Sequence, residues 1–356
     1  MTLRRWLRTL QEMYFSSRLL IFTEAQSFLH CKKASYQEDA AIDNAHATGY
    51  EFTFASFSSG IQHMNHIWLS IPTDSQYVRN EMSEVRFQGY HSPLQNYLPR
   101  NLTYESDMLN AFAGLLSSYE DILGKPIWGL PSKEFLRALS WNVSRPPLRR
   151  RQGFPSWSWC GWVYNKPILD TMNSPWFSTA TVYQITQDMQ KQGESAILTK
   201  IGGGLVSALH NGAEASTDCL PNEMALPKVL NFTRTRNIPD SHVLAIIASS
   251  AELTVADNPD EQGPYHLMYN VFDPASGLEV TQINLNPVWR SEQQKRGSRS
   301  FEFLFLGQAS GLYQLMLVER DSTGLYSRVQ CCFVREENQH LLTEPFGRPQ
   351  KTFFLI

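Results

Sequence analysis

The residue types that could do chemistry are concentrated in residues 149–164, which read RRRQGFPSWSWCGWVY. Exposed tryptophan rings stack on sugars or nucleic-acid bases, and neighbouring arginines add charge that attracts phosphate. Buried rings would instead line a hydrophobic core, where each is worth about 2–3 kcal/mol. Trp157 and Trp159 stand two residues apart, so on an extended segment they would face the same side, whereas Trp162, beyond Gly161, could face either side. We expect Trp157 and Trp159 to be buried, and the arginines to pair with acids or stack on the rings.

Other motifs that could do chemistry are weaker. His63 and His66 have a helical spacing that could share a metal ion, but no third ligand accompanies them, so we expect ordinary polar surface. Cys331 and Cys332 are adjacent on an expected strand and must point to opposite faces, so we expect at least one to be buried. The sequence contains no Gly-x-Ser-x-Gly elbow, and glycines 202–204 lack the Lys-Ser/Thr that completes a phosphate-binding loop. The sequence therefore predicts no catalytic, cofactor-binding or metal-binding residue.

The composition narrows the classes of protein that fit. Of the 356 residues, 42% are hydrophobic, 12% aromatic and 18% charged, which is typical of a globular chain rich in rings. A net charge of -3 disfavours a dedicated nucleic-acid binder, which usually carries a strong positive balance. No apolar run approaches the roughly 20 residues of a membrane span. The five cysteines are scattered and odd in number, which indicates reduced thiols and a cytoplasmic location.

The first half of the chain is expected to be mixed in structure. Residues 19–22 and 26–29 read as two short strands, and residues 32–60 as a polar loop. An amphipathic helix is predicted from an N-cap at Thr103 to a stop at Gly124. A second helix is predicted from 132 onward, and its inward face would carry Phe135, Leu136 and Leu139.

The second half is expected to be rich in strands. The predicted strands are residues 180–185, 243–248, 266–272, 301–306, 313–319 and 327–334. A hairpin turn is expected at 321–324, an exposed loop at 286–300, and the aromatic segment is expected to be the first strand of this half. The fold class predicted from these elements is α+β.

The aromatic segment also resembles a known family. GFPSWSWCGW is similar to the Phe-Pro-Ser-Trp-Ser-Trp-Ala-Gly-Trp signature downstream of the heterokaryon incompatibility (HET) domain of many fungal proteins, with Cys160 in place of the common alanine. Residues 127–141 resemble the family's Gly-Leu-Pro helix, and residues 351–356 its usual last strand. The family's Arg-x-Leu-Thr and Asp-x-Leu-x-Ala-x-x-Gly pattern is matched by Arg100, Leu102, Thr103, Asp107, Leu109, Ala111 and Gly114.

Residues 8–31 resemble the closing segment of the HET domain itself. The matching residues are Thr9, Gln11, Glu12, Ser17, Arg18, Phe22, Gln26 and Cys31, and Arg8 stands where the family has tryptophan. The family's opening motifs have no counterpart here, so the resemblance implies an N-terminally truncated member that is impaired in signalling. It divides the chain into the C-terminal end of a HET domain (1–35), a loop-rich connection (36–95), a helical segment (96–150) and a β-rich C-terminal region (151–356). Residues 1–35 would then be the remnant of a flavodoxin-like or Toll-like α/β domain.

The resemblance implies a non-enzymatic role in fungal allorecognition and cell-death signalling. The implied partners are other proteins, such as HET-domain or NLR-like signalling partners, with no nucleic acid, no membrane span and no cofactor. Two alternatives stay open. Toll-like relatives can cleave nicotinamide dinucleotides with a catalytic carboxylate, and Glu12 is the carboxylate here that matches the family motif. This activity would be expected only in a full-length parent protein. The β-rich region could instead be a ligand- or protein-binding module, which exposed rings at Trp157, Trp159 and Trp162 would support.

Overall fold

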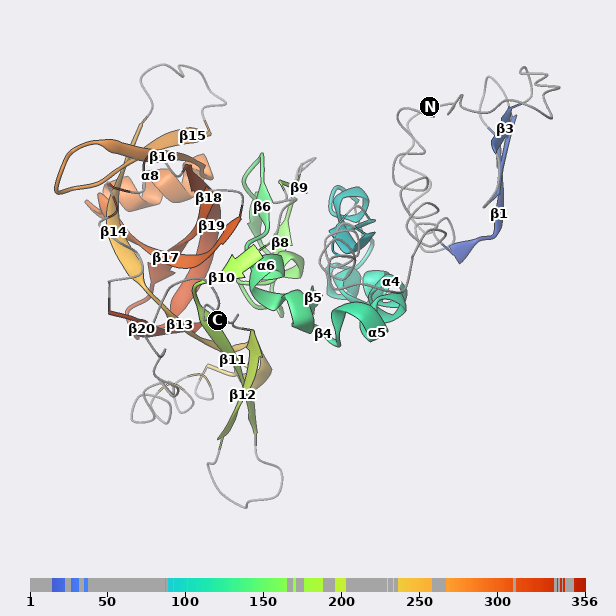
Figure 1. The fold of residues 1–356 in the computed structure, drawn as a ribbon, viewed down its shortest axis with the longest axis horizontal. Coiled ribbons are helices and arrows are strands. Elements are labelled where there is room, and N and C mark those ends of the chain that lie inside the picture. The colour runs from blue at the N-terminus through green and yellow to red at the C-terminus, as the bar shows by residue number, and fades with distance from the viewer. Residues whose placement is uncertain are drawn as a thin grey trace, which may run out of the picture.

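A helical segment packs against a large curled β-sheet in the computed structural model, and a second, three-stranded sheet lies near the N-terminus (Figure 1). The described residues are 15–22, 27–31, 35–37, 87–164 apart from 88, 92 and 101, 169–170, 176–187, 196–202, 229, 233, 236–257, 267–309, 312–335, 338, 340, 342 and 349–356. The residues singled out in the sequence that lie outside them are Arg8, Thr9, Gln11, Glu12, Gln26, His63, His66 and glycines 203 and 204. Most of the described helices precede the strands of the large sheet along the chain, and the combination of helices with a large, mostly antiparallel sheet fits the α+β class.

The small sheet contains three antiparallel strands, β1 (Arg18–Phe22), β2 (Ser27–Cys31) and β3 (Ser35–Gln37). The two strands predicted near the N-terminus are therefore confirmed. β3 lies within residues 32–60, and the loop prediction is wrong at these three positions. Tyr36 pairs with Leu29 of β2, because the outer edge of β2 offers a second row of backbone partners.

The helical segment begins before position 96. Residues 87–97 are helical at every described position, and 87–95 fall in the stretch expected to be a loop-rich connection. Their apolar side chains are buried with those of the later helices in one core. These residues therefore belong structurally to the helical segment.

The helix predicted over 103–124 is divided into four short elements. They are the 3-10 helices η2 (Glu105–Met108) and η3 (Asn110–Phe112) and the α-helices α4 (Ala113–Ser118) and α5 (Glu120–Leu123). The backbone departs from regular α-helical geometry at Phe112 and Tyr119, where ψ is −5° and −3°. The N-cap prediction at Thr103 is wrong, since Tyr104 precedes η2 and makes no side-chain cap. Gly124 ends the last helix at φ 80°, as predicted.

The second predicted helix is confirmed. It consists of η4 (Ser132–Glu134) followed by α6 (Phe135–Leu139), and its three predicted inward residues are buried. It follows a hairpin of β4 (Pro126–Ile127) and β5 (Leu130–Pro131), and β6 (Asn142–Val143) comes after it and pairs with β9 (Leu169–Asp170). Among the described residues, no helix has the length and apolar character to cross a membrane.

The large sheet has eleven strands in the order β12-β11-β13-β20-β19-β18-β17-β14-β15-β16, with β10 paired to the far end of β17. The strands are β10 (Trp176–Ser178), β11 (Thr181–Gln187), β12 (Ala196–Gly202), β13 (Leu244–Ala248), β14 (Ser250–Asp257), β15 (Met268–Phe272), β16 (Glu279–Asn284), β17 (Ser300–Ala309), β18 (Leu312–Arg320), β19 (Tyr326–Arg335) and β20 (Lys351–Leu355). All six predicted strands of this half are confirmed, as are the last strand and the turn at 321–324. The sequence did not predict β10, β12, β14 or β16.

The sheet curls because one long strand bends at Ser249 and the last strand in its order, β16, returns to lie against β19. Ser249 alone separates β13 from β14, so the two are halves of one strand that pairs with different neighbours. At the other end, β16 lies against β19, where Thr281 Oγ1 donates a hydrogen bond to Phe333 O. The inside of this curl, which we call the barrel core, consists of Ala251, Leu253, Val255, Tyr269, Val271, Val280, Ile283, Leu285, Phe301, Phe303, Phe305, Tyr313, Leu315, Leu317, Cys332, Val334 and Leu342.

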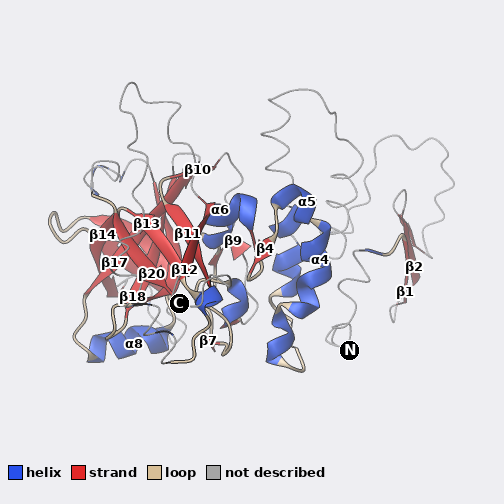
Figure 2. Cartoon of the chain, turned by 90° about the horizontal axis from the view of Figure 1, so that it is seen from below, coloured by secondary structure: helices blue, strands red, loops and turns tan. Residues whose placement is uncertain are grey.

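Strands β17 to β19 are covered on both faces. Their inward side chains belong to the barrel core, and their outward side chains are buried in one cluster with those of the helical segment. We call this outer contact the seam. In Figure 2, α6 lies between the large sheet and the helices α4 and α5. Cys332 faces the barrel core and Cys331 faces the seam, so the prediction of opposite faces is confirmed and both thiols are buried.

The loop predicted at 286–300 is wrong, because it contains the helix α8 (Pro287–Lys295). Asn286 caps its first turn and proline stands at its first position, both of which are start signals that the polar composition obscured. Trp289 packs on Phe301 at a ring separation of 5.4 Å and its Nε1 donates to Glu319. Tertiary contacts of this kind stabilise a helix that its own sequence barely favours.

Replacing Asn286 by alanine is expected to lower the free energy of unfolding by about 1–2 kcal/mol. Asn286 Oδ1 accepts from the Val288 N–H at 2.8 Å, and Nδ2 donates to Pro147 O at 2.8 Å and to Leu148 O. The aspartate variant keeps the cap acceptor and loses both donor contacts. Urea unfolding of N286A and N286D separates the cap bond from the two donor bonds. An N286D variant as unstable as N286A would show that the cap bond contributes nothing to stability.

Candidate functional site: the aromatic loop

The aromatic loop, residues 149–164, is a turn held at its base rather than a strand. Its ends form the short pair β7 (Arg149–Arg150) and β8 (Trp162–Val163), and between them lies the 3-10 helix η5 (Trp159–Gly161). Ser158 caps η5 by accepting a hydrogen bond from the Cys160 N–H. The predicted strand is therefore wrong over the middle of the segment, because the serine cap and the preceding Pro155 favour a turn.

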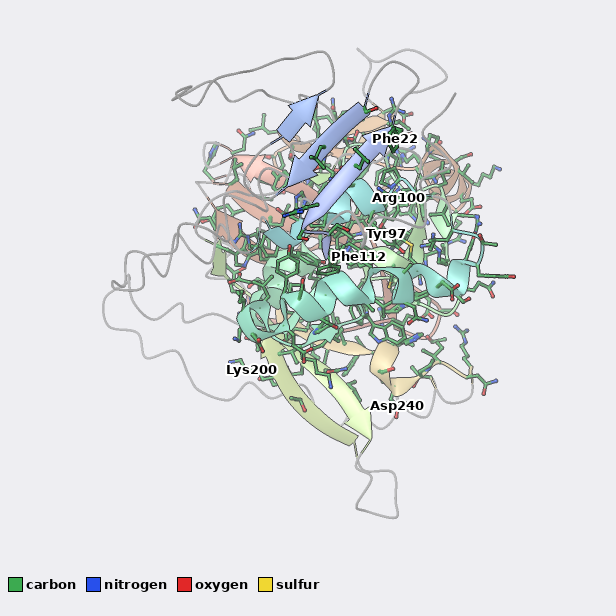
Figure 3. All side chains as sticks on the ribbon, turned by 90° about the vertical axis from the view of Figure 1, so that its right-hand side faces the viewer. Phe22, Tyr97, Arg100, Phe112, Lys200 and Asp240 are labelled. Atoms are coloured by element: carbon green, nitrogen blue, oxygen red, sulfur yellow. The ribbon has the colours of Figure 1, made fainter. Side chains whose placement is uncertain are left out.

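Trp159 anchors the loop in the helical segment. Its side chain is fully buried, with its ring edge-on to Phe112 at 5.6 Å and to Tyr97 at 6.1 Å. Tyr97 and Phe112 lie side by side (Figure 3), with ring centroids 4.9 Å apart. The indole Nε1 donates to Tyr90 Oη at 3.0 Å, so the one polar atom of the ring is satisfied inside the core.

Trp157 anchors the loop toward the sheet. It too is fully buried, 5.9 Å from the ring of Phe135 in α6. Its Nε1 donates to His242 O at 2.8 Å, directly before β13. The predicted burial of Trp157 and Trp159 is confirmed, and this removes the main evidence for the loop as a stacking platform in a ligand-binding module. Trp162 is the least buried of the three and lies under the guanidinium of Arg150 at 4.8 Å.

The three arginines are engaged within the protein. Arg149 is exposed and forms an ion pair with Glu105. Arg150 donates to Gly161 O and Phe154 O, at 3.1 and 2.9 Å. Arg151 Nη1 donates to Cys160 O at 2.8 Å and to Trp162 O at 2.7 Å. The prediction that the arginines pair with an acid or stack on rings is confirmed: Arg149 pairs with Glu105, Arg151 Nε lies 3.9 Å from Glu105 Oε2, and Arg150 lies over Trp162. Arg150 and Arg151 also donate to backbone carbonyls of the loop, so most of the basic run closes the loop.

A tight turn from another hairpin lies under the loop. Trp128 and Gly129 connect β4 and β5 with φ of 50° and 86°, the left-handed pair that a two-residue hairpin requires. Trp128 O accepts from Ser158 Oγ, and Gly129 lies so close to Trp159 that a β-carbon there would be 2.6 Å from the indole Cζ2. Sequence reasoning missed this turn, although a Trp-Gly pair between two short apolar runs was a usable signal.

Ser156 ties the loop to the sheet. Its N–H and hydroxyl both donate to Ile356 O at the end of β20, and its Oγ accepts from the Arg328 N–H of β19 at 3.1 Å. The aromatic loop therefore contacts the helical segment through Trp159, α6 through Trp157 and the sheet through Ser156. It connects the two halves of the molecule.

Burial keeps the thiols of the site protonated. Desolvation raises the pKa of Cys160 to about 12 and also raises the pKa values of Cys331 and Cys332. A cysteine nucleophile needs a thiolate, so none of these three groups is activated near neutral pH. Among the residues that the structure describes, no cluster of three or more His, Cys, Asp or Glu side chains could hold a metal ion.

Acid is expected to destabilise the protein as the pH falls from about 6.5 toward 4. Burial, with Arg150 as a weaker cause, lowers the pKa of His242 from 6.5 to about 4, and burial with Arg137 does the same for His91. In this window the unfolded chain binds more protons than the folded protein, so the free energy of unfolding rises with pH and is fully present above the ordinary histidine pKa. Urea unfolding at a series of pH values measures the slope. The H242F variant keeps a ring against Trp128 and should reduce that slope; an unchanged slope would contradict the assignment.

A scan of protein-family models, a search of characterised proteins and a search of solved structures each found no match to this chain.

Proposed function

We propose that this chain is a non-enzymatic protein of fungal allorecognition and cell-death signalling, of the family that carries the HET domain. The observation that carries the proposal is the resemblance of residues 153–162 to the signature downstream of that domain. We further propose that residues 1–35 are the end of a HET domain with a flavodoxin-like or Toll-like core.

The packing of the signature supports the proposal. Trp157 and Trp159 are buried against different parts of the protein, and Ser156 and Ser158 bond to the sheet and to the β4–β5 turn. A β-carbon at Gly161 would lie 2.3 Å from Pro155 O, so only glycine fits there without movement. A segment with this many separate constraints has little freedom to vary, as expected of a sequence signature that identifies a fold.

The electrostatics favour a role in binding proteins over catalysis or nucleic-acid binding. The buried thiols are protonated at neutral pH, and the basic run donates to backbone carbonyls and to Glu105. Nucleic-acid binders present such arginines to phosphates instead. We therefore propose other proteins as partners, with HET-domain or NLR-like signalling proteins as the first candidates.

Inducible expression in a filamentous fungus tests the proposal. The 356-residue chain is expressed alone, together with a protein that carries a complete HET domain, and as a variant lacking residues 1–35. We expect no cell death from the chain alone, co-precipitation with the HET-domain protein, and loss of co-precipitation in the shortened variant. Robust cell death from the chain alone would contradict the proposal that its signalling is impaired. Absence of co-precipitation would contradict the proposal that HET-domain proteins are its partners.

A nicotinamide assay tests the enzymatic alternative. Purified chain is incubated with NAD, and nicotinamide release is followed by chromatography. We expect no release above that of a heat-denatured sample. Release that disappears in the E12Q variant would replace the interaction proposal with the enzymatic one.

A further inference from the structure

The seam contains three buried hydrogen bonds between side chains of the sheet and the backbone of the helical segment. Three fully buried side chains of β18 and β19 donate hydrogen bonds to backbone carbonyls at and just after the end of α6: Gln314 to Ser140 O at 3.3 Å, Arg328 to Trp141 O, and Gln330 to Val143 O at 3.5 Å. These bonds hold the end of α6 and β6 in register on the sheet. They also place polar groups where the rest of the contact is apolar.

Arg328 is the most costly group in the seam. Its guanidinium carbon lies 3.3 Å from the ring centroid of Trp141, and the side chain is fully buried. Among the described residues, no carboxylate forms an ion pair with it, and its Nε and Nη1 have no hydrogen-bond partner. Its Nη2 also donates to Cys331 Sγ at 3.5 Å. A buried charge without a counter-ion is destabilising, and water would hydrate it if the seam opened.

The barrel core contains no residue of the helical segment or of the aromatic loop. All of its members lie between Ala251 and Leu342, and α8 packs on it through Trp289. The helical segment and the aromatic loop contribute to the other core cluster, across the sheet. The curled sheet can therefore keep its inner core when the elements on its outer face move away.

We propose that residues 87–164 form a cap that separates from the curled sheet as one unit, in a sparsely populated open state in which the sheet stays folded. The aromatic loop moves with the cap, because Trp159 and its partners Tyr97 and Phe112 all lie within it. Opening exposes the seam and hydrates Arg328, which lowers the free energy of the open state. This inference does not rest on the proposed function.

Two adjacent cysteines report on the opening. Cys331 faces the seam and Cys332 faces the barrel core. The two thiols are neighbours in the sequence and have the same chemistry, but different cores shield them from solvent. Native protein is treated with a small alkylating reagent without denaturant, and fragment ions of the tryptic peptide 329–335 read the two thiols separately. We expect Cys331 to be modified about tenfold faster than Cys332, or more. Equal rates, or a faster Cys332, would overturn the proposal.

A matched pair of variants tests the role of the buried charge. R328M replaces the guanidinium by an apolar side chain that gains nothing from hydration, and R328K keeps the charge. Dividing each rate by that of the same variant unfolded in urea corrects only for the unfolded thiol, and in the folded protein Arg328 Nη2 also donates to Cys331 Sγ at 3.5 Å. Hydrogen exchange of the Ser156 N–H, which donates to Ile356 O across the seam, therefore measures the opening in each variant without the thiol. We expect R328M to slow this exchange and the modification of Cys331 about tenfold and R328K to stay closer to the native rates. Faster exchange in R328M would show that Arg328 holds the cap closed and would overturn this assignment.

Discussion

Replacing Trp159 by alanine is expected to lower the free energy of unfolding by about 3–5 kcal/mol. The side chain is fully buried, meets Tyr97 and Phe112 edge-on, and donates to Tyr90 Oη, so truncation removes packing and leaves a buried hydroxyl without its donor. Urea unfolding followed by far-ultraviolet circular dichroism measures the change without depending on tryptophan fluorescence.

Trp162 is the matched control for Trp159. It lies three residues further along the same loop, but it is partly exposed, packs against Arg150 and donates to Ser156 O at 2.7 Å. We expect W162A to cost about 2 kcal/mol or less, because less apolar surface leaves a buried environment. Equal costs for the two substitutions would contradict the description of Trp159 as the main anchor of the loop.

Replacing Gly129 by alanine is expected to lower the free energy of unfolding by about 2–5 kcal/mol, through two effects. The residue has φ 86°, which an L side chain rarely adopts. The new β-carbon would also lie 2.6 Å from Cζ2 and 2.8 Å from Cε2 of Trp159, an indole fixed by its own contacts. The turn, the indole or both must move, and the hydrogen bond from Tyr90 to Gly129 O moves with them.

Gly153 separates the two effects. It has φ 81° and no atom within 4 Å of where a β-carbon would lie. G153A therefore carries only the cost of the backbone conformation, about 1–2 kcal/mol. If G129A were no more unstable than G153A, the close approach to Trp159 would have no energetic weight.

Local sequence predicted the elements whose own residues favour them. The strands at 243–248, 313–319 and 327–334 were found because their β-branched and aromatic runs are bounded by turn residues. The helix α8 was missed because it is polar, and contacts of Trp289 with Phe301 and Glu319 stabilise it. Strands β12, β14 and β16 were missed for a similar reason, since pairing with neighbours outweighs their weak intrinsic preference.

The candidate site divides in the same way. Burial of Trp157 and Trp159 was predictable, because two large apolar rings close together gain more from a core than from solvent. Their partners were not predictable. Trp159 meets Tyr90, 69 residues away, and Trp157 meets His242, 85 residues away, and no local pattern encodes such distances.

By itself, the sequence determined the α+β class, most of the long strands, the opposite faces of Cys331 and Cys332, and the burial of the two tryptophans. Each of these follows from a local period or from the preference of one side chain for a core. Only the tertiary structure decided that the aromatic loop is a turn, that its arginines bond to its own backbone, and that both adjacent cysteines are buried. The physical reason is that a strand buries both faces only when separate parts of the chain cover each of them. Here the barrel core covers one face and the helical segment with the aromatic loop covers the other.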